Sequence, residues 1–313
     1  MSRAHGSRLI LLFAFFFYLT GCSGPAPSGR VISSVAPREH AIARLRAKGI
    51  NADFLDLVVK NYREEERARV LDLNLLGFLK KRPEQDERVP RWELDRVRKF
   101  LYQNRSSFRD AEKRYAVPRE VIASLLWVET KYGRDAGTFH VASSFFSIAQ
   151  ADYPTILDQS LDRAKQLNGG DLTPEIEAKV AERSRNKAEW AANELMALQE
   201  IHQRGWKDAV TLKGSFSGAF GMSQFLPSSY IAWSRGRKDK ANLFDAGDAI
   251  LSVANYLTAN GWKRKEDESH KAALFHYNRD VNYVNRILRM GDCLLEEKKP
   301  KAKRKIATSG RYC

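Results

Sequence analysis

The chain has 313 residues, of which 43% are hydrophobic and 29% are charged. This composition is typical of a soluble globular protein, and an integral membrane protein is excluded because no apolar run after the first twenty residues is long enough to span a bilayer. The formal net charge of +15 at pH 7 suits an anionic partner, such as nucleic acid, anionic lipid or an acidic polymer.

The first segment of the chain predicts export. Arg3 and Arg8 form a basic start, and the apolar stretch 9–19 that follows is too short for a stable membrane span. Residues 1–21 are therefore predicted to be a signal peptide that is cleaved. Cleavage removes two cations and leaves a strongly basic chain. Export argues against nucleic acid as the partner.

The motif Leu-Thr-Gly-Cys at 19–22 resembles the lipobox of bacterial lipoproteins, in which Cys22 is acylated and becomes the first mature residue. The alternative is a plain signal peptide followed by an accidental cysteine. Ser23 resembles the sorting residue of lipoproteins sent to the outer membrane, which assigns the chain to its periplasmic face if the cell is Gram-negative. Residues 22–38, rich in Ser, Gly and Pro, then form a flexible tether to a folded domain at 39–295.

A helix from Pro118 to Gly133 carries the first candidate for chemistry. Proline suits a helix start, and glycine can end a helix in a left-handed cap. Helical spacing along the apolar side chains places Glu129 on the buried stripe. Burial and the negative end of the helix dipole should both raise the pKa of Glu129, which favours a role as an acid. The alternative is a structural glutamate paired with Lys131 or Arg134.

A long charged helix is expected next. Thr173 can cap it, Pro174 suits its first position, and Gly205 can end it. We interpret the region around 155–205 as a helical insertion that adds an arm or a wall to the domain. An ordinary pair of surface helices is the alternative.

The segment 214–225 contains three glycines among aromatic and small polar residues, which lets another chain approach its backbone closely. Pro227 then begins a new helix. The segment fails the G-x-S-x-G pattern of a serine nucleophile, so a serine hydrolase is not predicted.

Two further helices end in side chains suited to sugar binding. The helix 245–260 places Tyr256 beside its buried stripe, and the short helix 272–278 ends in Tyr277 and Asn278. Aromatic rings can stack on sugar faces while an amide orients the hydroxyl groups. Each of these residues taken alone also fits an ordinary core position.

The C-terminal part leaves two questions open. Cys293 and Cys313 can close a disulfide in an oxidising compartment or remain two free thiols. Residues 296–313 are rich in lysine and are predicted to be a disordered basic tail, which serves either solubility or contact with an anionic surface.

Four motifs occur together in one order: W-V-E-T-K-Y-G around Glu129, G-S-F-S-G-A-F-G-M-S-Q-F-L-P-S-S-Y from Gly214, N-L-F-D-A-G-D-A-I-L-S-V-A-N-Y-L from Asn242, and H-Y-N from His276. They resemble the membrane-bound lytic murein transglycosylases of the B type, and the resemblance covers most of 39–290. It implies a mainly α, lysozyme-like helical domain with a substrate groove, extended here by the long helical segment.

The resemblance also implies a reaction. The β-1,4 bond between N-acetylmuramic acid and N-acetylglucosamine in peptidoglycan would be cleaved without water, which leaves 1,6-anhydromuramic ends. One carboxylate, Glu129, would suffice as acid and base. The remaining site residues implied are Ser215 and Gln224 as hydrogen-bond partners of the sugar, Asn278 as a further polar contact, and Tyr256 and Tyr277 as aromatic walls.

Two alternatives to this function stay open. A hydrolytic muramidase needs a second carboxylate, for which Asp135 is the nearest candidate in sequence, although a solvated loop acid explains that residue equally simply. A catalytically inactive lipoprotein that binds peptidoglycan is the other alternative.

No metal or cofactor is expected. Some relatives carry a calcium loop after the glycine-rich segment, but here the equivalent stretch 234–241 is shorter and basic, with Asp239 as its only acid. His270 and His276 are six residues apart and do not share a helical face as a ligand pair. The expected partners are peptidoglycan strands and, through Cys22, a membrane.

Overall fold

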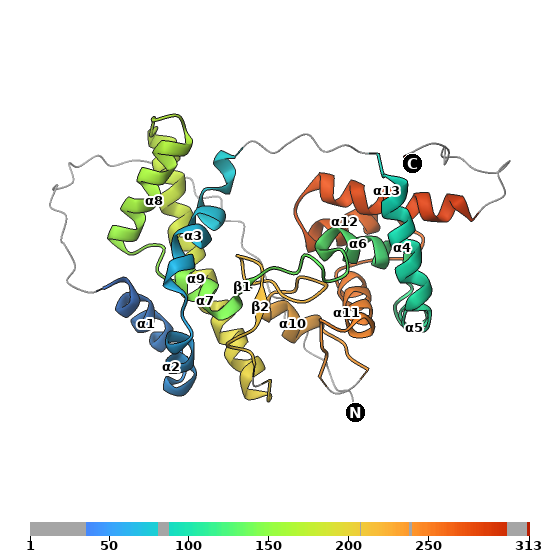
Figure 1. Ribbon diagram of the computed structural model, residues 1–313, viewed down its shortest axis with the longest axis horizontal. Helices are drawn as coiled ribbons and strands as arrows, with labels where there is room; N and C mark the ends of the chain where they lie inside the picture. The colour runs from blue at the N-terminus through green and yellow to red at the C-terminus, as the bar shows by residue number, and fades with distance from the viewer. Residues whose placement is uncertain (1–35, 81–87, 207, 238–239, 299–311) are drawn as a thin grey trace, which may run out of the picture. The chain divides into compact units, whose positions relative to one another are not determined.

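The computed structural model describes residues 36–80, 88–206, 208–237, 240–298 and 312–313, which all belong to one unit, Val35–Cys313 (Figure 1). The signal peptide, Cys22, Ser23 and nearly all of the tether lie outside the described residues. Asp239 and most of the basic tail also lie outside them.

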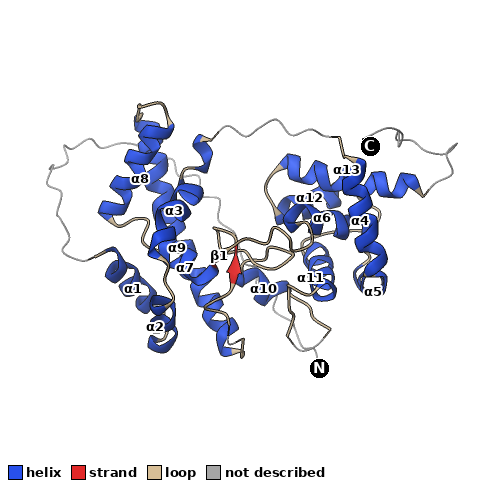
Figure 2. Cartoon of the chain, in the orientation of Figure 1, coloured by secondary structure: helices blue, strands red, loops and turns tan. Residues whose placement is uncertain are grey.

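The described residues are mainly α-helical (Figure 2), which confirms the expected fold class. The α-helices are α1 (Pro37–Ala47), α2 (Ala52–Lys60), α3 (Arg67–Leu75), α4 (Arg91–Gln103), α5 (Arg105–Tyr115), α6 (Arg119–Thr130), α7 (Val141–Ile148), α8 (Pro154–Leu167), α9 (Pro174–Gln203), α10 (Pro227–Trp233), α11 (Ala246–Ala259), α12 (Asp267–Tyr277) and α13 (Val281–Glu297). Two short strands, β1 (Phe139–His140) and β2 (Lys213–Gly214), pair antiparallel. No helix in the described ranges has the length and apolarity needed to cross a membrane.

Start signals in the sequence set several helix boundaries. Pro37 occupies the first turn of α1, so the folded part begins there and not at residue 39 as predicted. Thr173 caps α9 by accepting a hydrogen bond from the backbone of Ile176, as expected. The side chain of Asp245 accepts two backbone hydrogen bonds at the start of α11 in the same way.

Two hydrophobic clusters hold the helices together, and α9 belongs to both. In the larger cluster α9 contributes Leu195 and Leu198, which pack among buried residues of α6, α7 and α11. In the smaller cluster it contributes Val180 and Ala188, beside residues of α3 and α8. The long helix predicted from the sequence is therefore one continuous element, and it joins a second core to the main one.

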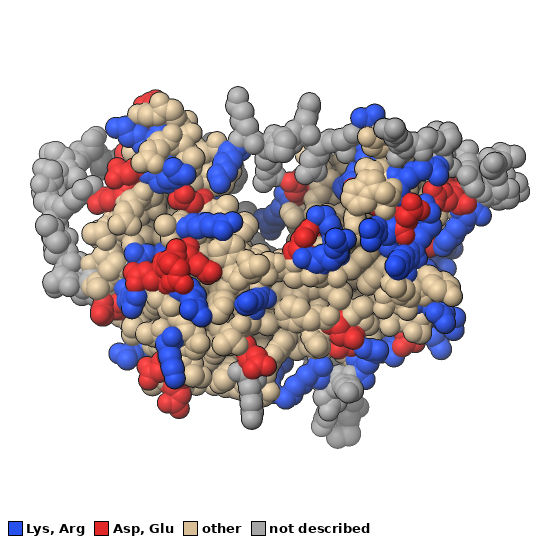
Figure 3. All heavy atoms as spheres, viewed as in Figure 1, with Lys and Arg blue, Asp and Glu red and all other residues tan. Residues whose placement is uncertain are grey.

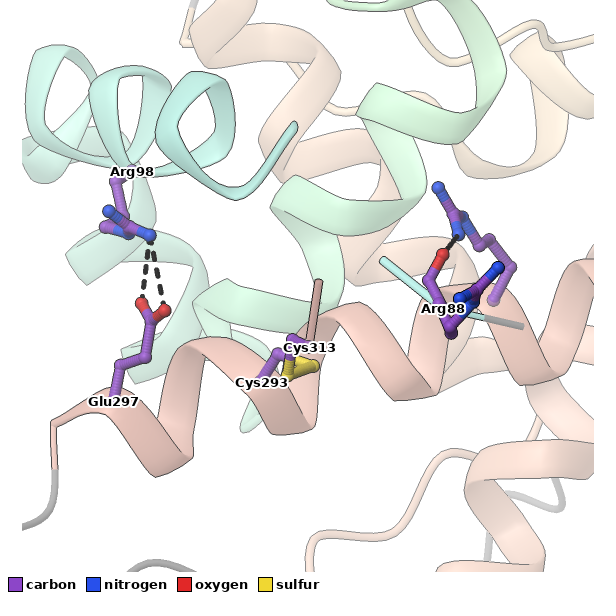
Figure 4. Close-up of a disulfide and its surroundings, with 6 residues drawn as sticks. Arg88, Arg98, Cys293, Glu297 and Cys313 are labelled. Atoms are coloured by element: carbon purple, nitrogen blue, oxygen red, sulfur yellow. Dashed lines mark hydrogen bonds and ion pairs between the residues drawn. A yellow bond between two sulfur atoms is a disulfide. The ribbon is translucent and has the colours of Figure 1, made fainter. Parts of the chain in front are cut away.

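A disulfide between Cys293 of α13 and Cys313 answers the question that the sequence leaves open (Figure 4). The backbone of Cys313 also exchanges two hydrogen bonds with Val89, just before α4, at 2.9 and 3.2 Å. The predicted disordered tail at 296–313 is therefore wrong at both ends: α13 continues through Glu297, and Cys313 is buried against the fold.

Removing this disulfide is expected to lower the free energy of unfolding by about 3 kcal/mol, because it closes a long loop in the unfolded chain. The change is Cys293→Ser together with Cys313→Ser, measured by urea denaturation without reductant. The wild-type chain in reductant should show the same loss. A loss below about 1 kcal/mol would contradict the expectation.

Candidate active site

The turn that follows Glu129 fixes where its carboxylate lies. Helix α6 ends at Thr130, slightly earlier than predicted, because Lys131, Tyr132 and Gly133 all adopt left-handed backbone conformations, with φ of 48°, 62° and 85°. The ring of Tyr132 then stacks on Phe100 at 3.7 Å between centroids, which anchors the reversal. Glu129 thus occupies the last turn of α6, partly exposed, where the chain reverses.

Among the described residues, the Glu129 carboxylate pairs with a tyrosine and with no cation. Tyr283 donates a hydrogen bond from its hydroxyl to Glu129 Oε1 at 2.5 Å. Burial raises the pKa of Glu129 to about 7, and the hydrogen bond from Tyr283 works in the opposite direction. Lys131, one suggested partner of a structural glutamate, instead pairs with Asp135. An acid that titrates near neutrality can both give and take a proton.

Tyr283 is the site residue that the sequence analysis missed. It lies in the first turn of α13, where Asp280 caps the helix by accepting backbone hydrogen bonds from Asn282 and Tyr283. A cap residue followed by apolar side chains signals a helix start, but no local pattern indicates that this helix faces α6. The contact with Glu129 spans 154 positions of sequence.

A row of tyrosines extends from this contact. The ring of Tyr277 stacks on that of Tyr283, with centroids 6.4 Å apart and planes at 17°, and its hydroxyl donates to the backbone carbonyl of Ser223. Tyr256 packs edge-on against Tyr277 at 4.6 Å, is only 6% exposed, and has its hydroxyl beside His276. Tyr256 is therefore a buried residue that packs against Tyr277. Asn278, at the end of α12, is exposed.

The glycine-rich loop docks onto the end of α6. Gln224 has a φ of 48°, and its side-chain nitrogen donates to the carbonyls of Ala136 and Gly221 at 3.1 and 3.0 Å. Thr130 donates from its hydroxyl to the carbonyl of Met222 at 2.9 Å. These contacts bring the loop that carries Gln224 next to the chain segment after Glu129.

The other predicted residue of this loop, Ser215, closes a turn. Its Oγ accepts a hydrogen bond from the backbone of Ala219 at 3.1 Å, and its own backbone N–H donates to the Ala219 carbonyl at 2.8 Å. The hydroxyl hydrogen of Ser215 is not used in these two bonds. Ser215 directly follows β2, whose Gly214 pairs with Phe139 of β1. The loop backbone is therefore fixed at both of its predicted sugar contacts.

Gly137 lies where the segment after Glu129 meets this loop. An added Cβ at Gly137 would lie 2.1 Å from the carbonyl oxygen of Gly214 and 2.7 Å from the nitrogen of Ser215. Its φ of 91° is also one that glycine alone adopts readily. This confirms the close backbone approach that the glycine density of 214–225 predicts.

The stretch 234–241, where no calcium is expected, contains a guanidinium in contact with acids. Arg237 Nη2 lies 2.6 Å from Asp245 Oδ1, and its Nε lies 3.4 Å from Asp248 Oδ1. Asp248, 6% exposed, also accepts hydrogen bonds from the backbone of Arg237 and Asn242. A cation of the chain itself therefore offsets part of the negative charge of the two carboxylates at the start of α11.

Tyr283→Phe is expected to move the pH profile of any reaction that uses Glu129 as an acid. In the wild-type chain the hydrogen bond from Tyr283 stabilises the ionised carboxylate. Without it the pKa of Glu129 should rise above about 7, and the alkaline fall in rate should move to higher pH. The maximal rate should drop about ten-fold because the carboxylate loses its orientation. Tyr102→Phe, at an exposed position, is the control. An unchanged profile would mean that Tyr283 does not act on Glu129.

Comparison with known sequences shows which proteins this chain is similar to. A family described as "Transglycosylase SLT domain" matches residues 37–286. The membrane-bound lytic murein transglycosylase B of Escherichia coli (strain K12) is 30% identical over 165 residues, which cover 52% of this chain. The matched region spans 37% of that relative's length.

Solved structures share the fold. The soluble lytic transglycosylase SltB1 from Pseudomonas aeruginosa superposes with a TM-score of 0.62 at 19% identity, over 84% of this chain and 99% of that one. The Escherichia coli lytic transglycosylase Slt35, solved in complex with calcium, gives 0.58 at 19% identity over 83% and 92%. SltB3 from Pseudomonas aeruginosa, in complex with NAG-NAM-pentapeptide, gives 0.55 at 18% identity over 82% and 78%.

Proposed function

This chain belongs to the transglycosylase SLT domain family, and from that membership we propose that it cleaves peptidoglycan glycan strands without water. The observation that carries the proposal is the state of Glu129. Its carboxyl is largely sheltered, its pKa is raised by burial to about 7, and its hydrogen-bond partner is the neutral hydroxyl of Tyr283. Such a group serves as acid and base in turn.

Glu129 protonates the oxygen that links N-acetylmuramic acid to N-acetylglucosamine, and the bond from that oxygen to the anomeric carbon breaks. Glu129 then removes the proton from the 6-hydroxyl of the muramyl residue, and this oxygen bonds to the same anomeric carbon. The product is a 1,6-anhydro ring, and Glu129 regains the proton it gave. Tyr283 occupies Oε1, which leaves Oε2 for the substrate.

The substrate contacts in this proposal come from the glycine-rich loop and from α12. Ser215 and Gln224 hydrogen-bond the sugar near the cleaved bond, Asn278 adds a polar contact, and Tyr277, supported by Tyr256, forms the aromatic wall. Figure 3 shows a hollow in the surface between the region of α3 and that of α6, with Lys and Arg side chains and some Asp and Glu side chains along its borders. The cations among them suit a polymer that carries carboxylates.

The proposed location is the periplasmic face of an outer membrane, with a lipid on Cys22. The name of the Escherichia coli relative, which describes a membrane-bound enzyme, supports this location. Labelling cells with a radioactive fatty acid tests it: the wild-type chain should incorporate label, and Cys22→Ser should not. Label on the Cys22→Ser variant would refute the assignment.

Product analysis separates this reaction from hydrolysis. We expect the purified chain to release muropeptides with 1,6-anhydro ends from sacculi, as read by mass spectrometry. Asp135→Asn should keep the wild-type rate within about two-fold, because Asp135 is exposed and pairs with Lys131. Reducing ends, with activity lost in Asp135→Asn, would select the muramidase alternative. Binding to sacculi without any soluble product would select the inactive lipoprotein.

A further inference from the structure

Three side chains from distant parts of the sequence meet beside the glycine-rich loop. The guanidinium carbon of Arg69, on α3, lies 5.2 Å from the ring centroid of Phe139, on β1. The ring of Phe139 in turn meets the ring of Phe216 edge-on, at 6.5 Å and 80°. Both rings are half-buried and Arg69 is exposed, so the three side chains form a surface that solvent reaches. We name Arg69, Phe139 and Phe216 the aromatic platform.

The platform is held rigidly next to a proposed sugar contact. Asn74 of α3, only 3% exposed, donates to the carbonyl of Phe216 at 3.1 Å and accepts from the hydroxyl of Ser217 at 2.8 Å. Phe139 is fixed by its pairing with Gly214. Phe216 directly follows Ser215, so a group attached to a sugar at Ser215 lies within reach of the platform.

The charge of Arg69 is not neutralised within the described part of the chain. Among those residues Arg69 forms no ion pair, whereas Asp72, on the same helix, pairs with Arg163. The neighbouring His140 has its pKa lowered by burial and by the cations Arg63 and Lys213, with Glu66 and Glu65 acting against them. Arg69 therefore contributes a positive charge to the exposed edge of the platform.

We propose that the aromatic platform binds the stem peptide of peptidoglycan through one of the peptide's carboxylates, an inference that rests on the proposed function. A guanidinium stacked on a ring keeps its N–H groups in a plane, where they can grip a carboxylate in bidentate fashion. The two rings shelter the short apolar part of the peptide. Arg69 is then a specificity-determining residue for strands that carry charged stems.

The test compares one substrate in two charge states. Soluble glycan strands are used either untreated or after carbodiimide amidation, which neutralises the stem carboxylates and keeps the peptides. Arg69→Gln should lower kcat/KM about ten-fold on untreated strands and change it less than two-fold on amidated strands. Amidation of the strands should lower kcat/KM of the wild-type protein by about the same factor as Arg69→Gln does on untreated strands. Equal loss on both substrates, or no loss on untreated strands, overturns the proposal.

Controls keep this result separate from the proposed function. Arg109→Gln removes the same charge from an exposed position on α5 and should behave as wild type on both substrates. If wild-type protein cleaves neither substrate, the proposed function fails. In that case the binding affinities of two inactive proteins, Glu129→Gln and the double variant Glu129→Gln with Arg69→Gln, are compared on untreated and amidated strands. If the two proteins bind untreated strands with the same affinity, the proposed role of the aromatic platform is overturned.

Discussion

Glu129→Gln is expected to abolish glycan cleavage, with a loss of about a thousand-fold or more in kcat. The amide has nearly the shape of the carboxylic acid and can still accept the hydrogen bond from Tyr283. It cannot protonate the glycosidic oxygen or remove a proton from the 6-hydroxyl. Release of 1,6-anhydro muropeptides from sacculi, followed by mass spectrometry, measures the loss.

The same variant should be more stable than wild type in alkaline solution. Folding raises the pKa of Glu129 from 4.5 to about 7, so the folded state disfavours its ionised form. The stabilisation from a neutral Glu129 is complete below pH about 4.5 and is lost as pH rises through about 7. At pH 8 we expect Glu129→Gln to gain about 3 kcal/mol in free energy of unfolding, and at pH 4 almost nothing.

Either of two results would contradict these expectations. A Glu129→Gln variant with more than about a tenth of wild-type activity would remove Glu129 from the role of acid. A variant less stable than wild type at pH 8 would mean that the carboxylate holds the fold together. Circular dichroism at both pH values confirms that each sample is folded.

Gly137→Ala is expected to lower the free energy of unfolding by about 4 kcal/mol and to remove activity with it. The new Cβ would need the space of the Gly214 carbonyl oxygen, 2.1 Å away, and Gly214 is held in place by its pairing with Phe139 of β1. The left-handed φ of 91° adds its own cost. Urea denaturation measures the stability loss.

Gly170→Ala provides a matched control for this change. Gly170 has nearly the same φ, 95°, but an added Cβ there meets nothing within 4 Å. Its loss should be only the backbone cost, about 1 kcal/mol. The difference between the two variants isolates the clash with the loop. Equal losses in both would show that the loop can move away from Gly137.

Local sequence signals predicted much of the fold. Pro227 and the cap at Thr173 marked helix starts that the structure confirms. The spacing of apolar residues placed Glu129 on the buried stripe of its helix, and in the structure the residue is partly exposed there. These signals depend on neighbours within about four residues, so they can be found without knowing the fold.

Features made by distant segments could not be predicted in this way. Tyr283 meets Glu129 across 154 positions, and its own neighbours contain no trace of that contact. Cys313 was assigned to a basic tail because its disulfide partner on α13 and its backbone partner, Val89, lie in other parts of the sequence. Tyr256 was expected on the groove wall, but rings from three other segments bury it.

The length of α9 has a consequence for how the protein comes apart. Helix α9 has thirty residues and contributes side chains to both hydrophobic clusters. If one cluster unfolds, that end of α9 loses its packing and the helix is destabilised, which weakens the other cluster as well. The helical arm is therefore not a removable accessory. It should melt in the same cooperative step as the main hydrophobic cluster.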